Sequence, residues 1–197
     1  MLHVVTTILS ALLVALSLAA PPPARANPHV WVEAWMTFEF EDHRVKALGF
    51  TWRFDEYYSS HTSQSYDRDG DGFLVRSEMR ALRAGVFDPL GESGYHVHVW
   101  AGGVKREGHE IDRFTARIVE KRLVIDFSVP ITPPADPGEG PVVVSLLDHN
   151  NEVDFGFAPS GFLRVMGALK PGCKFRLARG KGEQASHPRL VTLKCGA

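Results

Sequence analysis

Apolar and polar residues alternate strictly between His29 and Glu41. The apolar positions of this run are Val30, Val32, Ala34, Met36, Phe38 and Phe40. A period of two over this length predicts a long β-strand with one buried face. The segment EDHR that follows has the composition of a tight turn. The returning segment VKALGFTWRF aligns Leu48, Phe50, Trp52 and Phe54. The two runs together predict a β-hairpin.

The pattern changes after Phe54. The segment DEYYSSHTSQSY has no strand alternation and few apolar residues, which indicates a weak helix with Asp55 as its N-cap. After an acidic loop, SEMRALRAG indicates a stronger helix that Ser77 caps and Gly85 ends. We therefore expect a helix–loop–helix insertion over about residues 54–87.

Strand patterns return after the insertion. Four segments are rich in β-branched residues and have Gly or Pro at their edges: YHVHVWAGG, DRFTARIVE, RLVIDFSVP and PVVVSLLD. The tail adds CKFRLARG and RLVTLKC as a final strand pair. Short strands separated by turns predict a mainly β fold, specifically an antiparallel β-sandwich that carries an EF-hand-like helix–loop–helix insertion. We expect a single domain of this kind over residues 27–197.

The N-terminus has the composition of an export signal. The apolar run VVTTILSALLVALSLAA precedes PPPARA, in which Ala24-Arg25-Ala26 matches a small-x-small cleavage pattern. This predicts a signal peptide over residues 1–26; the alternative is an uncleaved membrane anchor. The triple proline before the cleavage site favours removal. No later segment is apolar and long enough to span a bilayer, so we expect a periplasmic protein without direct membrane insertion after signal removal.

Composition narrows the possible classes. Hydrophobic residues make up 44% of the chain and charged residues 23%, which argues against wholesale disorder. The net charge is -1 and no basic stripe is present, so we expect no nucleic-acid partner. The two cysteines, Cys173 and Cys195, predict a disulfide bond in an exported protein. A metal-binding thiol pair and two free thiols are the alternatives.

The segment DRDGDGFLVRSE, from Asp67 to Glu78, matches a calcium-binding loop. An EF-hand loop places oxygen ligands at positions 1, 3, 5, 7, 9 and 12 and glycine at position 6. The matching residues here are Asp67, Asp69, Asp71, Gly72, Phe73 (through its carbonyl) and Glu78. Val75 stands at position 9, where a water must replace a side-chain contact, so we expect weak Ca²⁺ binding of about 10⁻⁴–10⁻³ M. The alternative is an acidic surface turn.

Histidines supply candidate ligands for a softer divalent metal such as zinc, nickel, cobalt or copper. His96 and His98 lie two residues apart on a predicted strand, so we expect them to share a face. His29 near the mature N-terminus and His149 in the acidic segment DHNNEVD are further candidates. Ordinary strand and loop positions are the alternative for all four. No role is predicted for His43, His61, His109 and His187.

The sequence contains no motif that favours catalysis. It has no nucleophile elbow, phosphate loop or dinucleotide-binding fingerprint. The adjacent carboxylates Asp55 and Glu56 need not face a common pocket, because neighbours in sequence often diverge. We therefore expect a protein that is not an enzyme.

Three features together resemble a family of bacterial periplasmic proteins called domain of unknown function 1007. They are NPHVWVEA at the mature start, FTWRFDEYYS, and the acidic loop that follows. The resemblance runs from Asn27 to about Phe157. Family members usually begin HPHVWV, so Asn27 stands where the family has a histidine, and His29 alone remains of that pair. The resemblance implies an accessory role in divalent-metal handling, with a divalent-metal transporter of the inner membrane as a partner.

These observations lead to one main hypothesis and two rivals. The main hypothesis is an exported, non-catalytic accessory protein that binds one Ca²⁺ ion through a single EF-hand-like loop. The first rival is a periplasmic transition-metal carrier that uses His29 with His96 and His98 or with His149. The second rival is a metal-independent module in which Trp31 and Trp35 dock a membrane transporter.

Overall fold

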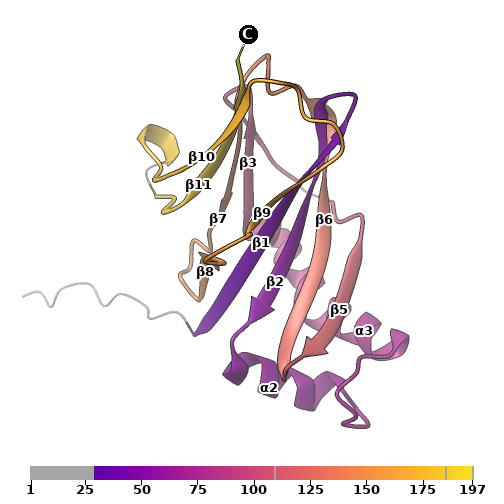
Figure 1. The fold of residues 1–197 in the computed structure, drawn as a ribbon. Coiled ribbons are helices and arrows are strands. Elements are labelled where there is room, and N and C mark those ends of the chain that lie inside the picture. Colours follow the sequence, from indigo (N-terminus) through magenta and orange to yellow (C-terminus); the bar gives the residue numbers. More distant parts are fainter. Residues whose placement is uncertain (1–28, 109, 185, 197) are drawn as a thin grey trace, which may run out of the picture.

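Two β-sheets form most of the protein (Figure 1). The structure, a computed structural model, describes residues 29–196 except 109 and 185, so the predicted signal peptide lies outside the described residues. The prediction of a mainly β fold is confirmed. Among the helices of the described residues, none is both long enough and apolar enough to cross a membrane.

The first sheet contains β1 (Val30–Glu41), β2 (Arg44–Phe54), β5 (Phe114–Val119), β6 (Arg122–Ala135), β8 (Val153–Phe157) and β9 (Leu163–Met166). Its order is β5-β6-β2-β1-β8, and β9 pairs with β1 beyond β8. Both β8 and β9 run parallel to β1, whereas the other pairs are antiparallel. The prediction of an antiparallel sandwich is wrong at this edge. The chain returns here from the other sheet, and such a crossover does not impose the antiparallel direction of a hairpin.

The second sheet is wholly antiparallel in its pairings, with the order β10-β11-β7-β3-β4. Its strands are β3 (Val97–Ala101), β4 (Val104–Arg106), β7 (Val142–Leu146), β10 (Cys173–Ala178) and β11 (Leu190–Cys195). The C-terminal strand pair predicted from the sequence is therefore confirmed, and it lies beside β7 rather than apart from the domain.

One hydrophobic core joins the two sheets, with buried residues from both in a single cluster. Along β1 the even-numbered side chains from Val32 to Phe40 are buried, as the alternation predicts. The ring of Phe38 on β1 lies 5.1 Å from that of Phe175 on β10, which brings the sheets into contact. The predicted β1–β2 hairpin is confirmed, and Asp42 and His43 form its turn with φ of 47° and 62°. Positive φ at both central residues suits a two-residue hairpin turn.

Helical segments connect β2 to β3. They are α2 (Glu56–Tyr66), α3 (Arg76–Leu82), a π-helical turn η1 (Arg83–Phe87) and a 3₁₀ segment η2 (Asp88–His96). A further short 3₁₀ turn, η3 (Gly182–Gln184), lies between β10 and β11. The predicted N-cap is confirmed, because the Asp55 carboxylate accepts a hydrogen bond from the Tyr58 N–H. Figure 1 shows α2 and α3 at one end of the first sheet, near β5 and β6.

Two predictions about the second helix are wrong. Ser77 lies inside the first turn of α3 and is not its cap; Val75 precedes the helix, and its N–H is bound by the Glu78 carboxylate. Gly85 does not end the helical region, which continues through η1 and η2. A larger residue at position 85 would require the Tyr66 side chain, at the end of α2, to shift, because a Cβ there would overlap the Tyr66 hydroxyl.

Side chains of the helical segment anchor it to the first sheet. The Ser59 hydroxyl of α2 accepts a hydrogen bond of 2.9 Å from the Leu123 N–H of β6. Leu82 and Phe87 are 1% and 0% exposed and belong to the main core. The Phe87 ring lies 4.9 Å from the Phe127 ring of β6. The insertion is therefore an integral part of the domain.

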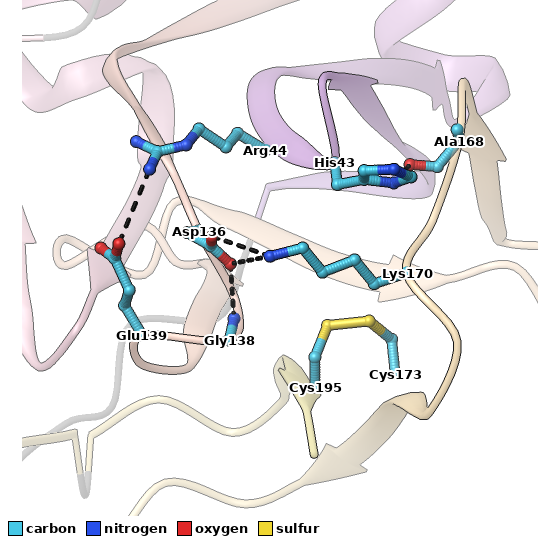
Figure 2. A network of polar contacts seen from close by, with 9 residues as sticks. All are labelled: His43, Arg44, Asp136, Gly138, Glu139, Ala168, Lys170, Cys173 and Cys195. Carbon is cyan, nitrogen blue, oxygen red and sulfur yellow. Dashed lines mark hydrogen bonds and ion pairs between the residues drawn. A yellow bond between two sulfur atoms is a disulfide. The ribbon is translucent and has the colours of Figure 1, made fainter. Parts of the chain in front are cut away.

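The far end of the domain holds a group of ion pairs (Figure 2). Lys170 donates to both oxygens of Asp136, at 2.9 and 3.2 Å, and the Gly138 N–H donates to one of them at 2.8 Å. The Lys170 ammonium and this N–H hold the pKa of Asp136 below its usual value. Arg44, just after the β1–β2 turn, pairs with Glu139 at 3.6 Å. These contacts tie the connection between β6 and β7 to the first residue of β2, through Arg44, and to the segment before β10, through Lys170.

The predicted disulfide between Cys173 and Cys195 is confirmed and lies beside this group (Figure 2). The two residues are directly paired in the β10–β11 register, and 22 positions separate them in sequence. A disulfide of this kind is typical of proteins from oxidising, exported compartments.

We expect the double substitution Cys173→Ser, Cys195→Ser to lower the free energy of unfolding by about 3 kcal/mol, because a closed loop of this length restricts the unfolded chain. Urea denaturation followed by circular dichroism measures the change. A reducing agent should destabilise the wild-type protein by a similar amount and leave the double variant unaffected. Equal sensitivity of both proteins to the reducing agent would contradict the prediction.

Candidate functional site

The acidic loop follows directly on α2 and brings three carboxylates together. Candidate ligand oxygens of Asp67, Asp69 and Asp71 all lie within 4.8 Å of one another. Among the described residues, this is the one group of three or more acidic, histidine or cysteine side chains that meets this distance. Asp67 is half-buried, and the other two are exposed to solvent. The structure thus gathers the three aspartates that the sequence predicts as ligands.

Backbone N–H groups organise these carboxylates. Asp67 accepts hydrogen bonds of 3.0 Å from the N–H groups of Gly70 and Gly72, one on each oxygen. Asp71 accepts one of 2.8 Å from the Phe73 N–H. Gly70 and Gly72 have φ of 69° and 82°, a conformation that favours glycine and that winds the loop tightly. Backbone N–H groups of the loop therefore hold the Asp67 and Asp71 carboxylates in place.

Glu78, the predicted ligand in the first turn of α3, lies outside this group of three carboxylates. Its side chain is 5% exposed, although it carries a carboxylate. One oxygen accepts the Arg68 N–H at 2.7 Å, and the other accepts the Val75 N–H at 3.1 Å. A carboxylate oxygen has more than one lone pair, so each still has capacity for a cation. Phe73, the predicted carbonyl ligand, has a side chain that is 71% exposed.

A second polar cluster is formed by three histidine rings, which we call the histidine cluster: His98, His149 and His187. The ring centroids of His98 and His187 are 4.8 Å apart, those of His98 and His149 are 5.0 Å apart, and those of His149 and His187 are 6.1 Å apart. His98 and His187 are buried at 7% and 4% exposure, whereas His149 is exposed. Two of these residues were predicted ligands, and His187 was not.

The three residues of the histidine cluster come from three separate segments of the chain. Strand β3 sends Val97 and Val99 into the core, so His98 faces outward together with Trp100. The connection between β10 and β11 carries His187 over this outer face, and the ring of His187 lies 5.1 Å from that of Trp100. Hydrogen bonds within the connection fix the backbone of His187, whose N–H donates to the Gln184 carbonyl at 2.9 Å. His149 comes from the turn after β7.

His96 does not share a face with His98, so that expectation is wrong. Tyr95 and His96 have φ of 55° and 53°, and β3 begins only at Val97. This left-handed backbone breaks the strand alternation on which the expectation depended. The His96 ring turns inward to lie 5.7 Å from that of Phe155.

Asp148, next to His149 in sequence, directs its carboxylate to the backbone of its own turn and towards His96. Its carboxylate accepts hydrogen bonds from the N–H groups of Asn150, Glu152 and Val153, at 2.8–3.0 Å, and lies 3.8 Å from the His96 Nδ1. Burial alone would raise the pKa of Asp148, but these donors hold the pKa below its usual value. Asp148 therefore shapes the turn and does not join His149 in a carboxylate-rich site.

The remaining predicted residues lie along β1. His29 is exposed at the start of the strand, where its N–H donates to the Glu152 carbonyl at 2.9 Å. Trp31 is 49% exposed. Trp35 is half-buried beneath the Arg53 guanidinium, which lies 5.5 Å from its ring. Of the two tryptophans, Trp31 is the more accessible to a partner.

Burial keeps the inner histidines neutral. Desolvation lowers the pKa of His98 to about 4, and the nearby His187 and His149 add to this effect. Desolvation, followed by the His149 charge, also lowers the pKa of His187. The His98 Nε2 lies 3.0 Å from the Leu147 carbonyl, which only accepts hydrogen bonds, so Nε2 carries the proton. The lone pair of neutral His98 is therefore on Nδ1.

No sequence spacing marks His187 as part of this cluster. It lies 89 positions after His98, and no motif joins the two. Only the strand order connects His187 with His98. His187 lies three residues before β11; β11 pairs with β7, and β7 pairs with β3, which carries His98. That order of strands is not readable from the local pattern.

Comparisons with known proteins give a family and one relative. The family model described as "Protein of unknown function (DUF1007)" matches residues 12–194. An uncharacterized 15.5 kDa protein in the trpE 3′ region of Spirochaeta aurantia is 30% identical over 96 residues, which cover 49% of this chain and 68% of that protein. Neither description states an activity.

We expect the stability of metal-free protein to fall as pH decreases below 6.5. Unfolded histidine has a pKa of about 6.5, and folded His98 has one of about 4. The stabilisation is therefore complete above pH 6.5 and is lost progressively towards pH 4, by up to about 1.4 kcal/mol per pH unit. Urea unfolding at several pH values in the presence of a chelator measures this slope. His98→Gln should reduce the slope without removing it, because the pKa values of His96 and His187 are lowered as well. His61→Gln, at an exposed site on α2, should leave the slope unchanged, and equal slopes in the two variants would contradict the assignment.

Proposed function

The chain belongs to the family of proteins of unknown function DUF1007, and from its acidic loop we propose that it is an exported protein that binds one Ca²⁺ ion. The observation that carries the proposal is the convergence of candidate ligand oxygens of Asp67, Asp69 and Asp71 within 4.8 Å of one another. The ligand set would consist of these three carboxylates, the Phe73 carbonyl and the Glu78 carboxylate.

The charges of the loop favour a hard dication. Two unit charges 4 Å apart repel by about 1 kcal/mol in water and by about 4 kcal/mol near a protein surface. The N–H groups of Gly70, Gly72 and Phe73 offset part of this repulsion. A bound Ca²⁺ ion would remove the rest, because it accepts six to eight oxygen ligands in flexible geometry. Oxygen ligands alone also select against softer metals.

The ion would act on the structure through both flanking helices. Asp67 ends α2, and Glu78 lies in the first turn of α3, so an ion held by both carboxylates joins the two helices. These helices are anchored to the first sheet through Ser59 and Leu82. Binding would therefore stabilise the insertion on the sheet. A constitutive structural site of this kind suits an affinity of about 10⁻⁴–10⁻³ M outside the cytoplasm, where calcium is abundant.

The proposed cellular role is that of a non-catalytic accessory protein in periplasmic divalent-metal handling. This role is the one that the resemblance described under Sequence analysis implies, and the disulfide between Cys173 and Cys195 supports an exported location. The exposed aromatic side chains of Trp31 and Tyr57, at 49% and 83%, suit contact with a membrane transporter. If that contact alone is the function, binding to the transporter will survive treatment with a chelator.

We expect chelator-treated protein to bind one Ca²⁺ ion, with a dissociation constant of about 10⁻⁴–10⁻³ M in a calorimetric titration. Calcium at ten times that constant should stabilise the fold by about 1.4 kcal/mol. Glu78→Gln should weaken binding by about 10-fold or more, because it removes one charge from the ligand set. Asp154→Asn changes an exposed carboxylate on β8 and serves as the control. Absence of heat at millimolar calcium, with protein that is folded by circular dichroism, would exclude the site.

We also expect Val75→Asp to tighten calcium binding by about 10-fold, because it supplies the missing ligand at position 9 and one more negative charge. Val75 is 50% exposed and precedes α3, so the substitution should leave the fold intact. Aspartate is also a better N-cap than valine and will stabilise the helix without calcium. The relevant measurement is therefore the affinity and not the melting temperature. Unchanged or weaker affinity would show that position 9 does not face the ion.

A further inference from the structure

The spacing of the rings in the histidine cluster is close to that of three imidazoles around one metal ion. Zinc binds histidine nitrogen at about 2.0–2.1 Å, which puts ring centroids about 3.2 Å from the metal and about 5.2 Å from one another in a tetrahedral site. The observed separations are 4.8, 5.0 and 6.1 Å. The longest involves His149, which is exposed on a turn and free of the packing that holds His98 and His187. The ring nitrogens of the three histidines do not all lie within 4.8 Å of one another in this arrangement. Binding one ion would therefore require a side-chain rotation, for which the exposed His149 has the most freedom.

A buried nitrogen in this cluster lacks a partner. Nδ1 of His187 is inaccessible to solvent and has no hydrogen bond to any described residue. Leaving such an atom unpaired costs about 1–3 kcal/mol. The His187 ring is 4% exposed and packs beside the rings of His98 and Trp100, so water does not reach this nitrogen. A ligand that accepts this lone pair, or takes the place of its proton, would remove that cost.

The orientation of His98 matches that of a metal ligand. Its Nε2–H donates to the Leu147 carbonyl, which leaves the Nδ1 lone pair available. Histidines that bind metal ions commonly donate their second ring N–H to a backbone carbonyl in this way. The outward face of His98 also borders a groove of about 430 Å³, which His149 lines as well. The groove gives an ion and a water molecule access from solvent to His98 and His149, and His187 lies behind them, outside the residues that line the groove.

Charges around the groove do not prevent cation binding. Lys105 lines the groove, but its ammonium is paired with Glu107 at 3.0 Å. Arg106 also lines it, and so does Glu92. Glu107 lines the groove as well, so its two acidic and two basic lining side chains give a net formal charge of zero.

We propose that His98, His149 and His187 bind one divalent transition-metal ion of the zinc–copper class, with an open coordination position facing the groove. Imidazole nitrogen suits zinc, copper and nickel, and does not suit calcium, so this site differs in chemistry from the acidic loop. Three protein ligands with one position left for water or another ligand is the arrangement of an exchangeable or reactive metal site. A structural zinc site would instead have four protein ligands.

A packed group of aromatic rings around Trp100 is the competing explanation for the cluster. The edge-on contact of His187 with Trp100, at 5.1 Å, is compatible with both explanations. The two differ in what they require of the nitrogen atoms. Packing alone leaves His187 Nδ1 unpaired, whereas a metal ion gives it a role.

The test is a Zn²⁺ titration of the chelator-treated full chain, carried out by indicator competition with excess Ca²⁺ present to fill the acidic loop. We expect one zinc equivalent, and we expect His149→Gln to weaken binding by about 100-fold or more, because even residues that only support a ligand contribute 10–100-fold. His149 is exposed, so this variant should fold normally. His187→Gln should lose a similar factor. His61→Gln, on an exposed face of α2, is the matched control and should bind like the wild type.

Cobalt provides a second measurement that folding effects alone would not mimic. Co²⁺ in place of zinc should give the intense visible absorption of a four-coordinate site in wild-type protein, and His149→Gln should lose it. Asp67→Asn should keep zinc affinity and the cobalt spectrum while losing calcium, so failure of one site leaves the other testable. Equal zinc affinity in His149→Gln, His61→Gln and the wild type would overturn the proposal, as would zinc binding that Asp67→Asn abolishes.

Discussion

The burial of Val97, Val99 and Ala101 against the first sheet constrains everything built around β3, because a strand that sends these side chains into the core must send His98 and Trp100 to the opposite face. That face would otherwise expose Trp100 of β3 and Val143 of β7 to solvent. The connection between β10 and β11 covers it, and the disulfide at the other end of that strand pair holds the cover in register. His187 is part of this cover. The same packing that completes the domain therefore places a third imidazole above the second sheet.

The two candidate metal sites follow from different levels of organisation. The acidic loop depends on local chain geometry, since its aspartates converge through turns that Gly70 and Gly72 permit within a dozen residues. The histidine cluster depends on tertiary structure, since its members come from β3, the turn after β7 and the segment before β11. Oxygen ligands in the first and nitrogen ligands in the second select different classes of ion. If both proposals hold, the two sites would therefore not compete for the same ion.

This difference explains what the sequence could predict. Short-range sequence patterns predict the β1–β2 hairpin, the N-cap Asp55 and the positions of the acidic loop. The structure contains the hairpin and the cap, and it brings the three aspartates of the loop together. The parallel pairing of β8 and β9 with β1 depends on crossovers between sheets, which leave no local pattern. His96 was misplaced because strand alternation was extended two residues too far, into the left-handed backbone at Tyr95 and His96. His187 was missed because its neighbours are distant in sequence.

Phe87 lies on the helical segment between the acidic loop and the groove beside the histidine cluster, so its packing decides whether a structural change at the loop can reach the groove. After the acidic loop, the helical segment runs from α3 through η1 into η2. Residues 91–94 of η2 line the groove beside His98. A disturbance at the loop would reach that wall if the segment between them were loosely held. Phe87 lies between them, is 0% exposed, and contacts the rings of Phe127 and Tyr95 at 4.9 and 5.0 Å. This anchor fixes the groove wall to the core whether or not the loop holds an ion. Each site can therefore form without the other, and an ion lost from the loop would loosen α2 and α3 while leaving the histidine cluster in place.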